Sequence, residues 1–367
     1  MNPLPSLLSA ILATQAVFAD DPAGTSPPVR VVEVALNYAS VCVLLGGGTL
    51  RCWSAEGGSG GALRATWTRT GVKGVRSTGA SICLVDGTGA WCGKDLGKGE
   101  PDLTAIPEGF VADHLSSPVR EIASCDGGQP NGCATDESGA TACWGEAAVG
   151  QQCQASFDSL ALPSRPAPPL GAIRLAVGTE HACGLWADGG VYCWGAGGWG
   201  GGAYDNDAPP HLVPGLPPAA VIDADVDGTC ALDREGTVWC WGCGVPFGET
   251  CGAAPVKKPL PDGRAVSVDV GSRHACALSE NGNVWCWGDA TEGQFAAEGG
   301  SSKIPRLVEG FPEEATHIAA SADGTCALME GGALYCWGGV FRETASPASS
   351  LCFIDRLEVP PPHQDDR

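Results

Sequence analysis

The chain has 367 residues, of which 42 are acidic and 21 basic, so its net charge at neutral pH is -21. Such a chain lacks the positive surface that a nucleic-acid backbone requires, which argues against nucleic acid as a partner. The 54 glycines, 28 prolines and two methionines disfavour a helical protein, because glycine costs about 1 kcal/mol relative to alanine inside a helix. We therefore expect an all-β fold rich in turns.

The first residues are apolar. Residues 7–19 contain few polar side chains, and they end in the small residue Ala19, directly before Asp20. This pattern predicts a secretory signal peptide at residues 1–19 and a short linker at residues 20–28. The alternative is an apolar strand or an unstructured tail, because no Lys or Arg precedes Arg30. No later segment is long and apolar enough for a membrane-spanning helix. We expect no membrane insertion and a protein that is secreted, periplasmic or held at the cell surface.

The cysteines reveal an internal repeat. Seven pairs occur along the chain: Cys42/Cys52, Cys83/Cys92, Cys133/Cys143, Cys183/Cys193, Cys230/Cys240, Cys276/Cys286 and Cys326/Cys336. A glycine stands six residues after the first cysteine of every pair, and in six copies tryptophan directly follows the second cysteine. The second copy differs, because Trp91 precedes Cys92. The mean period of about 47 residues is typical of propeller blades.

The cysteine spacing predicts a β-hairpin with a defined register. In the sixth copy, a three-residue loop ending at Gly282 would place Leu278 opposite Val284, and Cys276 opposite Cys286. Cysteines opposite each other on paired strands are close enough for a disulfide bond. Buried, reduced cysteines are the alternative. An oxidising compartment favours the bonds, and the spacing disfavours zinc.

Each unit carries about four predicted strands, as a propeller blade does. A further strand precedes each hairpin, and a proline-bounded run lies before that strand. On this interpretation the chain enters at the second strand of a unit, residues 29–36. Residues 355–359 are then left over as a first strand that completes the first blade. Residues 29–359 are thus predicted to form one closed, monomeric ring, followed by a disordered tail at residues 360–367.

The repeated unit resembles a known family. Residues 268–288 read Val-x-x-Gly-x-x-His-x-Cys-Ala-Leu-x-x-x-Gly-x-Val-x-Cys-Trp-Gly, and Gly150-Gln151 and Gly293-Gln294 follow two of the Trp-Gly pairs. This unit is similar to the repeat of the regulator of chromosome condensation superfamily, and the cysteines resemble those of exported bacterial members. The resemblance implies a single seven-bladed β-propeller of four-stranded blades that binds protein. The founder's nucleotide exchange and chromatin contact do not fit an acidic, exported chain.

Five cysteines lie outside the repeat pairs. Cys125 and Cys153 fall on loops of one blade that the strand alternation places on the same rim, so we predict a bond between them. Cys243 and Cys251 flank one loop and are predicted to close it. Cys352 remains without an assigned partner.

The longest loops follow the Trp-Gly pairs and share that rim. They combine aromatic and acidic side chains, which are the predicted partner-binding residues: Trp199, Tyr204, Asp205, Asp207, Phe247, Glu249, Asp289, Glu292, Phe295 and Phe341. Loops on a rigid scaffold often bind partners, and aromatic anchors often dominate the energy of an interface. The alternative is that the aromatic rings cover the undersides of the loops while the acids keep the surface soluble.

No pattern of catalytic or metal-binding residues stands out. Residues 223–228 match the first half of a calcium loop, but Arg234 occupies the position of the essential glutamate. His181 and His274 hold equivalent repeat positions and are interpreted as structural. We therefore predict no cofactor, no metal and no catalysis, and an exported scaffold with a protein partner that the sequence does not name. The alternatives are an extracellular enzyme inhibitor and a carbohydrate-binding or hydrolytic propeller.

Overall fold

The structure, a computed structural model, describes most of the repeat region. The described residues are 31–37, 40–55, 63–78, 81–93, 104–105, 119–125, 131–136, 141–144, 171–178, 181–195, 210–226, 228–243, 252–295, 300–341 and 352–356. Almost all their regular structure is β-strand, together with one turn of 3-10 helix, η1 (Gly339–Phe341). Within these ranges no helix has the length and apolar character needed to cross a membrane.

The described strands form seven antiparallel sheets, each made from consecutive strands of the chain. The first three are β1 (Val31–Leu36), β2 (Ser40–Leu45), β3 (Leu50–Ala55), β4 (Leu63–Arg69); β5 (Val72–Thr78), β6 (Ser81–Asp86), β7 (Gly89–Gly93), β8 (Thr104–Ala105); and β9 (Val119–Cys125), β10 (Asn131–Asp136), β11 (Thr141–Trp144). The fourth and fifth are β12 (Ala172–Val177), β13 (His181–Trp186), β14 (Val191–Gly195), β15 (His211–Leu212); and β16 (Ala219–Asp225), β17 (Gly228–Asp233), β18 (Val238–Gly242), β19 (Gly252–Lys258). The sixth and seventh are β20 (Ala265–Val270), β21 (His274–Ser279), β22 (Val284–Gly288), β23 (Ser302–Leu307); and β24 (Ala315–Ser321), β25 (Gly324–Met329), β26 (Ala333–Gly338), β27 (Cys352–Arg356).

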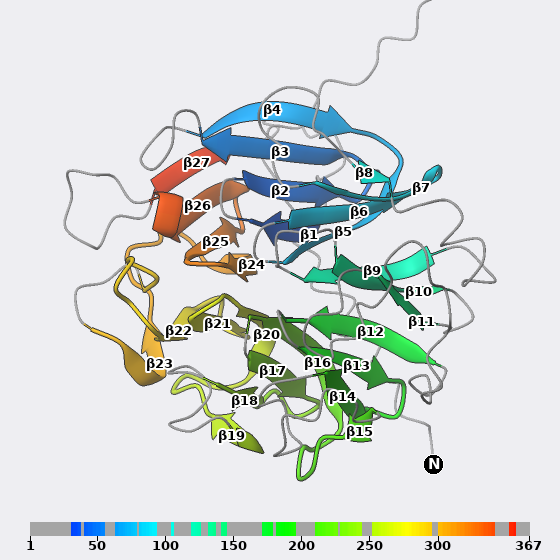
Figure 1. The fold of residues 1–367 in the computed structure, drawn as a ribbon. Helices are drawn as coiled ribbons and strands as arrows, with labels where there is room; N and C mark the ends of the chain where they lie inside the picture. Colours follow the sequence, from blue (N-terminus) through cyan, green and yellow to red (C-terminus); the bar gives the residue numbers. More distant parts are fainter. Residues whose placement is uncertain are drawn as a thin grey trace, which may run out of the picture.

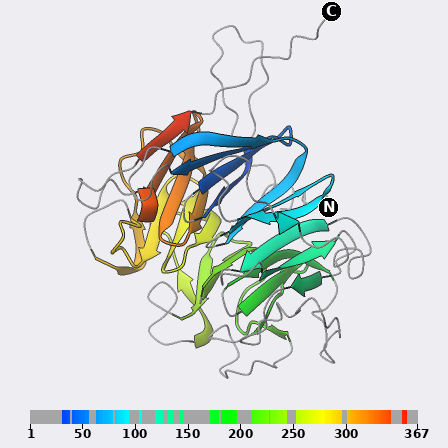
Figure 2. The same cartoon turned by 45° about the horizontal axis from the view of Figure 1, so that its top comes forward.

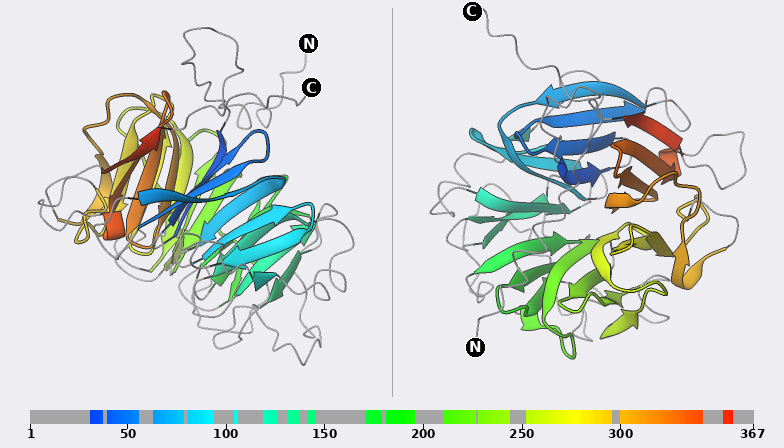
Figure 3. Two further views of the ribbon diagram at one scale, coloured as in Figure 1. Left: turned by 90° about the horizontal axis from the view of Figure 1, so that it is seen from above. Right: turned by 180° about the vertical axis from the view of Figure 1, so that it is seen from behind.

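The sheets stand around a common centre as the blades of a propeller (Figure 1). The first strand of each sheet lies innermost, and β1 packs against β5 on one side and against β24 on the other. The views in Figures 2 and 3 show the strands crossing the thickness of the disc, so that turns and loops gather on its two faces. The predicted all-β propeller is confirmed.

The hairpins have the predicted register. Leu278 lies opposite Val284 and Cys276 opposite Cys286. The turn needs glycine, because Gly282 has a φ of 72° and a Cβ there would lie 2.5 Å from the Cβ of Glu314 in the next blade. The hairpin tips therefore also fix the spacing between neighbouring blades.

The cysteine pairs of the hairpins are disulfide bonds. Six bonds join Cys42–Cys52, Cys83–Cys92, Cys183–Cys193, Cys230–Cys240, Cys276–Cys286 and Cys326–Cys336. Cys133 is also disulfide-bonded and stands opposite Cys143 in the register of the third sheet. The prediction of bonded cysteines is confirmed for these hairpins, and the bonds are consistent with an oxidising environment.

A buried tryptophan joins each of several blades to the disulfide of the blade before it. Trp287 of the sixth blade lies in one core cluster with Cys230 and Cys240 of the fifth. Trp337 of the seventh blade is likewise clustered with the disulfide of the sixth. The same contact recurs at the two ends of the repeat array, where Trp53 of the first blade shares a cluster with the disulfide of the seventh. The Cys-Trp pairs of the sequence thus build the interfaces between blades.

Two details of the predicted propeller need correction. The strand expected at residues 355–359 to complete the first blade is instead β27, residues 352–356, and it pairs with β26 of the seventh sheet. The first sheet is complete without it, because β1 is the innermost strand of a unit and not the second. In addition, the third sheet has three described strands, whereas the other six have four.

The described residues test only part of the predictions for the remaining cysteines. Cys243 is disulfide-bonded, while its predicted partner Cys251 lies outside the described residues. Cys153, the predicted partner of Cys125, also lies outside them. Cys352 stands opposite Cys336 on paired strands.

Candidate functional site

The face of the disc that carries the turn between β20 and β21 and the loop between β22 and β23 is the candidate site. In the sixth blade it begins with the turn at residues 271–273, between β20 and β21. A Cβ on Gly271 would lie 2.4 Å from His274 Cε1 and 2.8 Å from the carbonyl oxygen of Ala322. Ala322 itself has a positive φ of 48° and accepts a 2.8 Å hydrogen bond from the amide of Ser272. Glycine is therefore required for the turns of two blades to meet.

The histidines of the repeat, His181 and His274, are buried beside these turns and contact the next blade. The Nε2 atom of His274, which is fully buried, lies 2.7 Å from the hydroxyl of Thr325 in the next blade. His181 makes the same 2.7 Å contact with Thr229. Burial lowers the pKa of both histidines to about 4, so both are neutral at physiological pH. The arrangement agrees with the structural interpretation of these residues, and within the described ranges no group of three potential metal ligands occurs.

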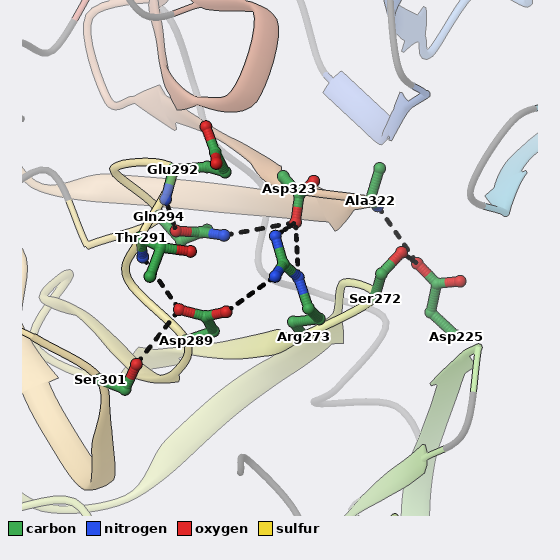
Figure 4. Close-up of polar contacts among 10 residues, drawn as sticks. All are labelled: Asp225, Ser272, Arg273, Asp289, Thr291, Glu292, Gln294, Ser301, Ala322 and Asp323. Carbon is green, nitrogen blue, oxygen red and sulfur yellow. Dashed lines mark hydrogen bonds and ion pairs between the residues drawn. The ribbon is translucent and has the colours of Figure 1, made fainter. Parts of the chain in front are cut away.

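Arg273 joins the sixth and seventh blades on this face (Figure 4). One of its terminal nitrogens lies 3.0 Å from a carboxylate oxygen of Asp289, and the other lies 3.2 Å from Asp323. Its Nε also donates to Asp323, at 3.3 Å. Half of the Arg273 side chain is exposed, whereas that of Asp289 is 16% exposed. We call Arg273, Asp289 and Asp323 the arginine bracket.

The bracket is continued by the loop between β22 and β23. Asp289 accepts hydrogen bonds from the amide of Thr291 and the hydroxyl of Ser301, at opposite ends of that loop. The fully buried Gln294 accepts from the amide of Glu292 at 2.9 Å and donates to Asp323 at 3.3 Å. Figure 4 shows these side chains converging from the loop and from the two turns beside it. The exposed surface is thus held by a network of hydrogen bonds.

A second carboxylate on the same face joins three blades. Asp225, at the end of β16, accepts a 3.2 Å hydrogen bond from the amide of Ala322 and lies 3.5 Å from the hydroxyl of Ser272 (Figure 4). It is only 3% exposed. The fifth, sixth and seventh blades therefore present one continuous, fixed surface.

The electrostatics of the bracket favour its charged form. Partial burial raises the pKa of Asp289, but hydrogen bonds from Thr291 and Ser301 and the charge of Arg273 outweigh it, and the pKa lies below the usual value. Burial lowers the pKa of Arg273, yet Asp323 and Asp289 raise it further, so the net shift is upward. Asp289 and Arg273 therefore stay ionised across the physiological range.

The predicted partner-binding residues divide into three groups. Six lie outside the described residues: Trp199, Tyr204, Asp205, Asp207, Phe247 and Glu249. Asp289 and Glu292 lie on the loop that the bracket holds. Phe295 and Phe341 are only 2% and 5% exposed, and both belong to the core between blades. For these two rings the structure shows the alternative arrangement, in which loop aromatics pack inward.

Sequence reasoning missed Arg273, Asp323 and Gln294. Arg273 stands between the repeat residues Gly271 and His274, at a position where the fourth blade has Glu180. A single basic residue amid acidic rim loops is the signal that would have identified it.

A second group of charged side chains meets near the axis. Asp223 accepts a 2.6 Å hydrogen bond from the amide of Val270, and Asp269 accepts one from Ala320 at 3.2 Å. Arg76 and Arg174, on β5 and β12, both act electrostatically on these two carboxyls, so side chains from four innermost strands converge. Burial raises the pKa of Asp223 to about 6, and burial together with the charge of Asp223 raises that of Asp269.

Replacing Asp223 with asparagine is expected to raise the melting temperature more at pH 7 than at pH 5. The folded-state pKa of about 6 exceeds the ordinary 3.8, so ionisation makes folding less favourable as the pH rises through this window. Asparagine cannot ionise, and its oxygen still accepts the hydrogen bond from Val270. Thermal denaturation of variant and wild type at both pH values measures the effect.

Comparing variant with wild type at each pH is essential. The buried His181, His274 and His317, whose pKa values burial lowers to about 4, destabilise the folded state as the pH falls below 6.5. This opposite trend is common to both proteins and cancels in the difference. The exposed substitution Glu235→Gln is the control. An equal gain from Asp223→Asn at the two pH values would contradict the assignment.

Comparison with known families identifies repeats in the sixth and seventh blades. Residues 265–294 and residues 281–328 each match a family model described as the Regulator of chromosome condensation (RCC1) repeat. No curated protein matches the chain significantly.

Several solved structures share the fold. Human WBSCR16 is 15% identical, with a TM-score of 0.64, over 85% of this chain and 94% of its own. Prp20p from Saccharomyces cerevisiae, described with its binding properties to Gsp1p and histones, is 15% identical with a TM-score of 0.59, over 80% of this chain and 81% of its own. The ectodomain of the Physcomitrella patens receptor kinase CR4 is 18% identical with a TM-score of 0.53, over 85% of this chain and 74% of its own. At these identities the likeness extends to the fold alone.

Proposed function

We propose that this β-propeller, in which residues 265–328 match the regulator of chromosome condensation repeat, is an exported, monomeric, non-catalytic scaffold that binds another protein. The binding surface is the loop face that contains the arginine bracket. Prp20p, a structure of the same fold, binds the protein Gsp1p, which supports protein binding as the style of function.

The arginine bracket is the observation that carries this proposal. It fixes the loop after β22 and the turn after β24 by ion pairs and hydrogen bonds while half of Arg273 remains exposed. A preorganised surface loses less conformational entropy when a partner binds, so more of the contact energy appears as affinity. Loops held on a rigid scaffold are also where binding residues commonly lie.

Export is supported by the disulfide bonds. Structural disulfides persist in oxidising compartments and are rare in the cytosol. Six bonds among the described hairpins, together with the apolar residues 7–19, fit a protein that folds after export.

The scaffold in this proposal is a closed ring of seven blades. The contact of Trp53 with the disulfide of the seventh blade supports closure, because it repeats the contact found between sequential blades. Closure gives the binding face a fixed curvature.

The non-catalytic assignment is supported by the structural hydrogen bonds that the buried titratable groups make. The carboxylates of Asp223, Asp225 and Asp269 accept hydrogen bonds from backbone amides of other blades. The buried His181 and His274 lie within hydrogen-bond distance of threonine hydroxyls. These groups hold blades together, so we assign them no role in proton transfer.

Affinity purification of the exported, oxidised protein with partners from its native compartment tests the proposal. The double variant Trp199→Ala/Tyr204→Ala and, separately, Arg273→Met are each expected to weaken partner binding about tenfold or more, because interface anchors typically contribute over 1 kcal/mol. Leu212→Ala is the matched control, since Leu212 is 54% exposed on the outer strand β15 of the fourth blade.

The outcomes distinguish the functions. Retention of every partner by both rim variants would contradict the binding face. If the protein forms a stoichiometric complex with a secreted enzyme, and that enzyme loses its activity in the complex, the protein is an inhibitor. If it retains glycans and no protein partner, a carbohydrate-binding propeller is favoured. Turnover of a substrate by the purified protein would overturn the non-catalytic assignment.

A further inference from the structure

The outer strands of the fifth and sixth blades carry a basic surface on an acidic protein. Although the chain has 42 acidic residues, the segments Gly252–Lys258 and Ser302–Leu307 contain none. Three of the six lysines of the chain, together with Arg306, lie on these two strands. Lys257, Lys303 and Arg306 are exposed. The local charge is therefore opposite to that of the whole molecule.

The same strands expose apolar side chains. Ile304 is 70% exposed and Val256 45%, among the most exposed large apolar side chains in the described residues. Isolated exposed apolar residues are ordinary, but here each lies next to a basic residue on its strand: Val256 precedes Lys257, and Ile304 follows Lys303. We call Val256, Lys257, Lys258, Lys303, Ile304 and Arg306 the basic belt.

Lys258 joins the two strands of the basic belt. It is only 6% exposed, and its Nζ donates a 3.0 Å hydrogen bond to the carbonyl oxygen of Lys303. The end of β19 therefore meets the start of β23, and the belt continues from one blade to the next. Burial lowers the pKa of Lys258, and the charge of Lys303 lowers it further. Lys258 thus connects the strands, while the exposed Lys257, Lys303 and Arg306 present the charges that a partner can reach.

Part of the backbone of β23 is unavailable for strand pairing. The hydroxyl of Ser302 donates to the carbonyl of Ile304 at 2.8 Å and accepts from its amide at 3.3 Å. The next residue, Pro305, has no amide hydrogen. Such devices keep edge strands from adding a further strand. A partner must therefore be recognised by the side chains of the belt.

We propose that the basic belt binds an acidic segment of a partner protein. Carboxylates of the segment pair with the ammonium and guanidinium groups, and its apolar residues contact Ile304 and Val256. Charge complementarity supports this occupant, because the net charge of -21 repels an acidic partner from most of the surface and leaves the belt as its point of approach.

Protection of strand edges does not by itself account for the belt. Exposed lysines and prolines are common on edge strands for that purpose. That purpose does not require a lysine that is only 6% exposed, or an isoleucine that is 70% exposed on the strand beside it. The belt starts close to the bracket, because Ser301, directly before β23, donates a hydrogen bond to Asp289. The belt variants leave Arg273, Asp289 and Asp323 unchanged, so the two surfaces can still be tested with separate variants.

Fluorescence anisotropy with the full, oxidised protein tests the proposal. The probe is a fluorescein-labelled peptide of alternating glutamate and valine. We expect saturable binding that weakens as salt is added, and a loss of about tenfold or more in affinity for Lys303→Glu/Arg306→Glu. Ile304→Ser is expected to weaken binding without changing the salt dependence.

The control is Lys73→Glu, which reverses one positive charge, as Lys303→Glu alone does, at an exposed position on β5 of the second blade. Circular dichroism and thermal denaturation show whether each variant is folded. Absence of saturable binding, or an equal loss in Lys73→Glu, would overturn the proposal. So would equal binding of a lysine-valine peptide, or binding to vesicles of anionic phospholipid with no binding of the acidic peptide.

Discussion

Replacing Gly271 with alanine is expected to lower the free energy of unfolding by about 3 kcal/mol. The added Cβ would lie 2.4 Å from His274 Cε1 and 2.8 Å from the backbone oxygen of Ala322. His274 is held by Thr325 and fully buried, so its ring cannot move aside without breaking that contact. Urea denaturation of the oxidised protein measures the loss.

Two further variants make this result specific. Gly178→Ala should reproduce it, because a Cβ there would lie 2.5 Å from His181 and 2.7 Å from the carbonyl oxygen of Val226. Gly74→Ala is the control, since nothing lies within 4 Å of a Cβ at that position. If Gly271→Ala costs no more than Gly74→Ala, the close packing of turns between blades is not a main source of stability.

Removing the disulfide of the sixth blade with Cys276→Ala/Cys286→Ala is expected to cost about 2 to 5 kcal/mol. Part of this loss is the greater chain entropy of the unfolded hairpin. The rest arises because Trp337 of the seventh blade packs in the same cluster as both sulfur atoms, so the variant leaves unfilled space at an interface between blades. Thermal and urea denaturation of the purified variant measure the cost.

The first blade provides a matched comparison. Cys42 and Cys52 close a hairpin of the same length, but the tryptophans packed on their cluster, Trp67 and Trp91, are only partly buried. Cys42→Ala/Cys52→Ala should therefore cost less than the variant of the sixth blade. An equal or larger loss in the first blade would show that chain entropy alone explains the effect. Titration of thiols in denatured, unreduced wild type, giving few free thiols, verifies the starting state.

The local structure was predictable from spacing. Cysteines ten residues apart with a glycine between them admit one hairpin register, and Cys276 does lie opposite Cys286. The place of each strand within a blade was not predictable in the same way. A periodic pattern defines the repeat length but not where a unit begins. The strand predicted at residues 355–359 was therefore assigned to the first blade, whereas residues 352–356 pair with β26 of the seventh.

The residues of the candidate site were harder to predict from the sequence than the hairpins. An aromatic residue in a loop has the same sequence pattern whether its ring is exposed or buried, and the rings of Phe295 and Phe341 are buried. The contact between Arg273 and Asp323 joins residues fifty positions apart, and it depends on how two blades meet. The basic belt likewise arises from two strands brought together by the ring.

The order of the strands has a consequence for how the ring is assembled. Each sheet is made from consecutive strands, so nearly all strand pairing joins neighbouring parts of the chain. Contacts that are local in sequence form quickly, whereas a contact between distant segments requires a large loop to close. The packing of β1 against β24 is the one blade interface that spans almost the full length of the described chain. We therefore expect blades to form one after another and this seam to be sealed last, which makes it the place where the ring first opens under stress.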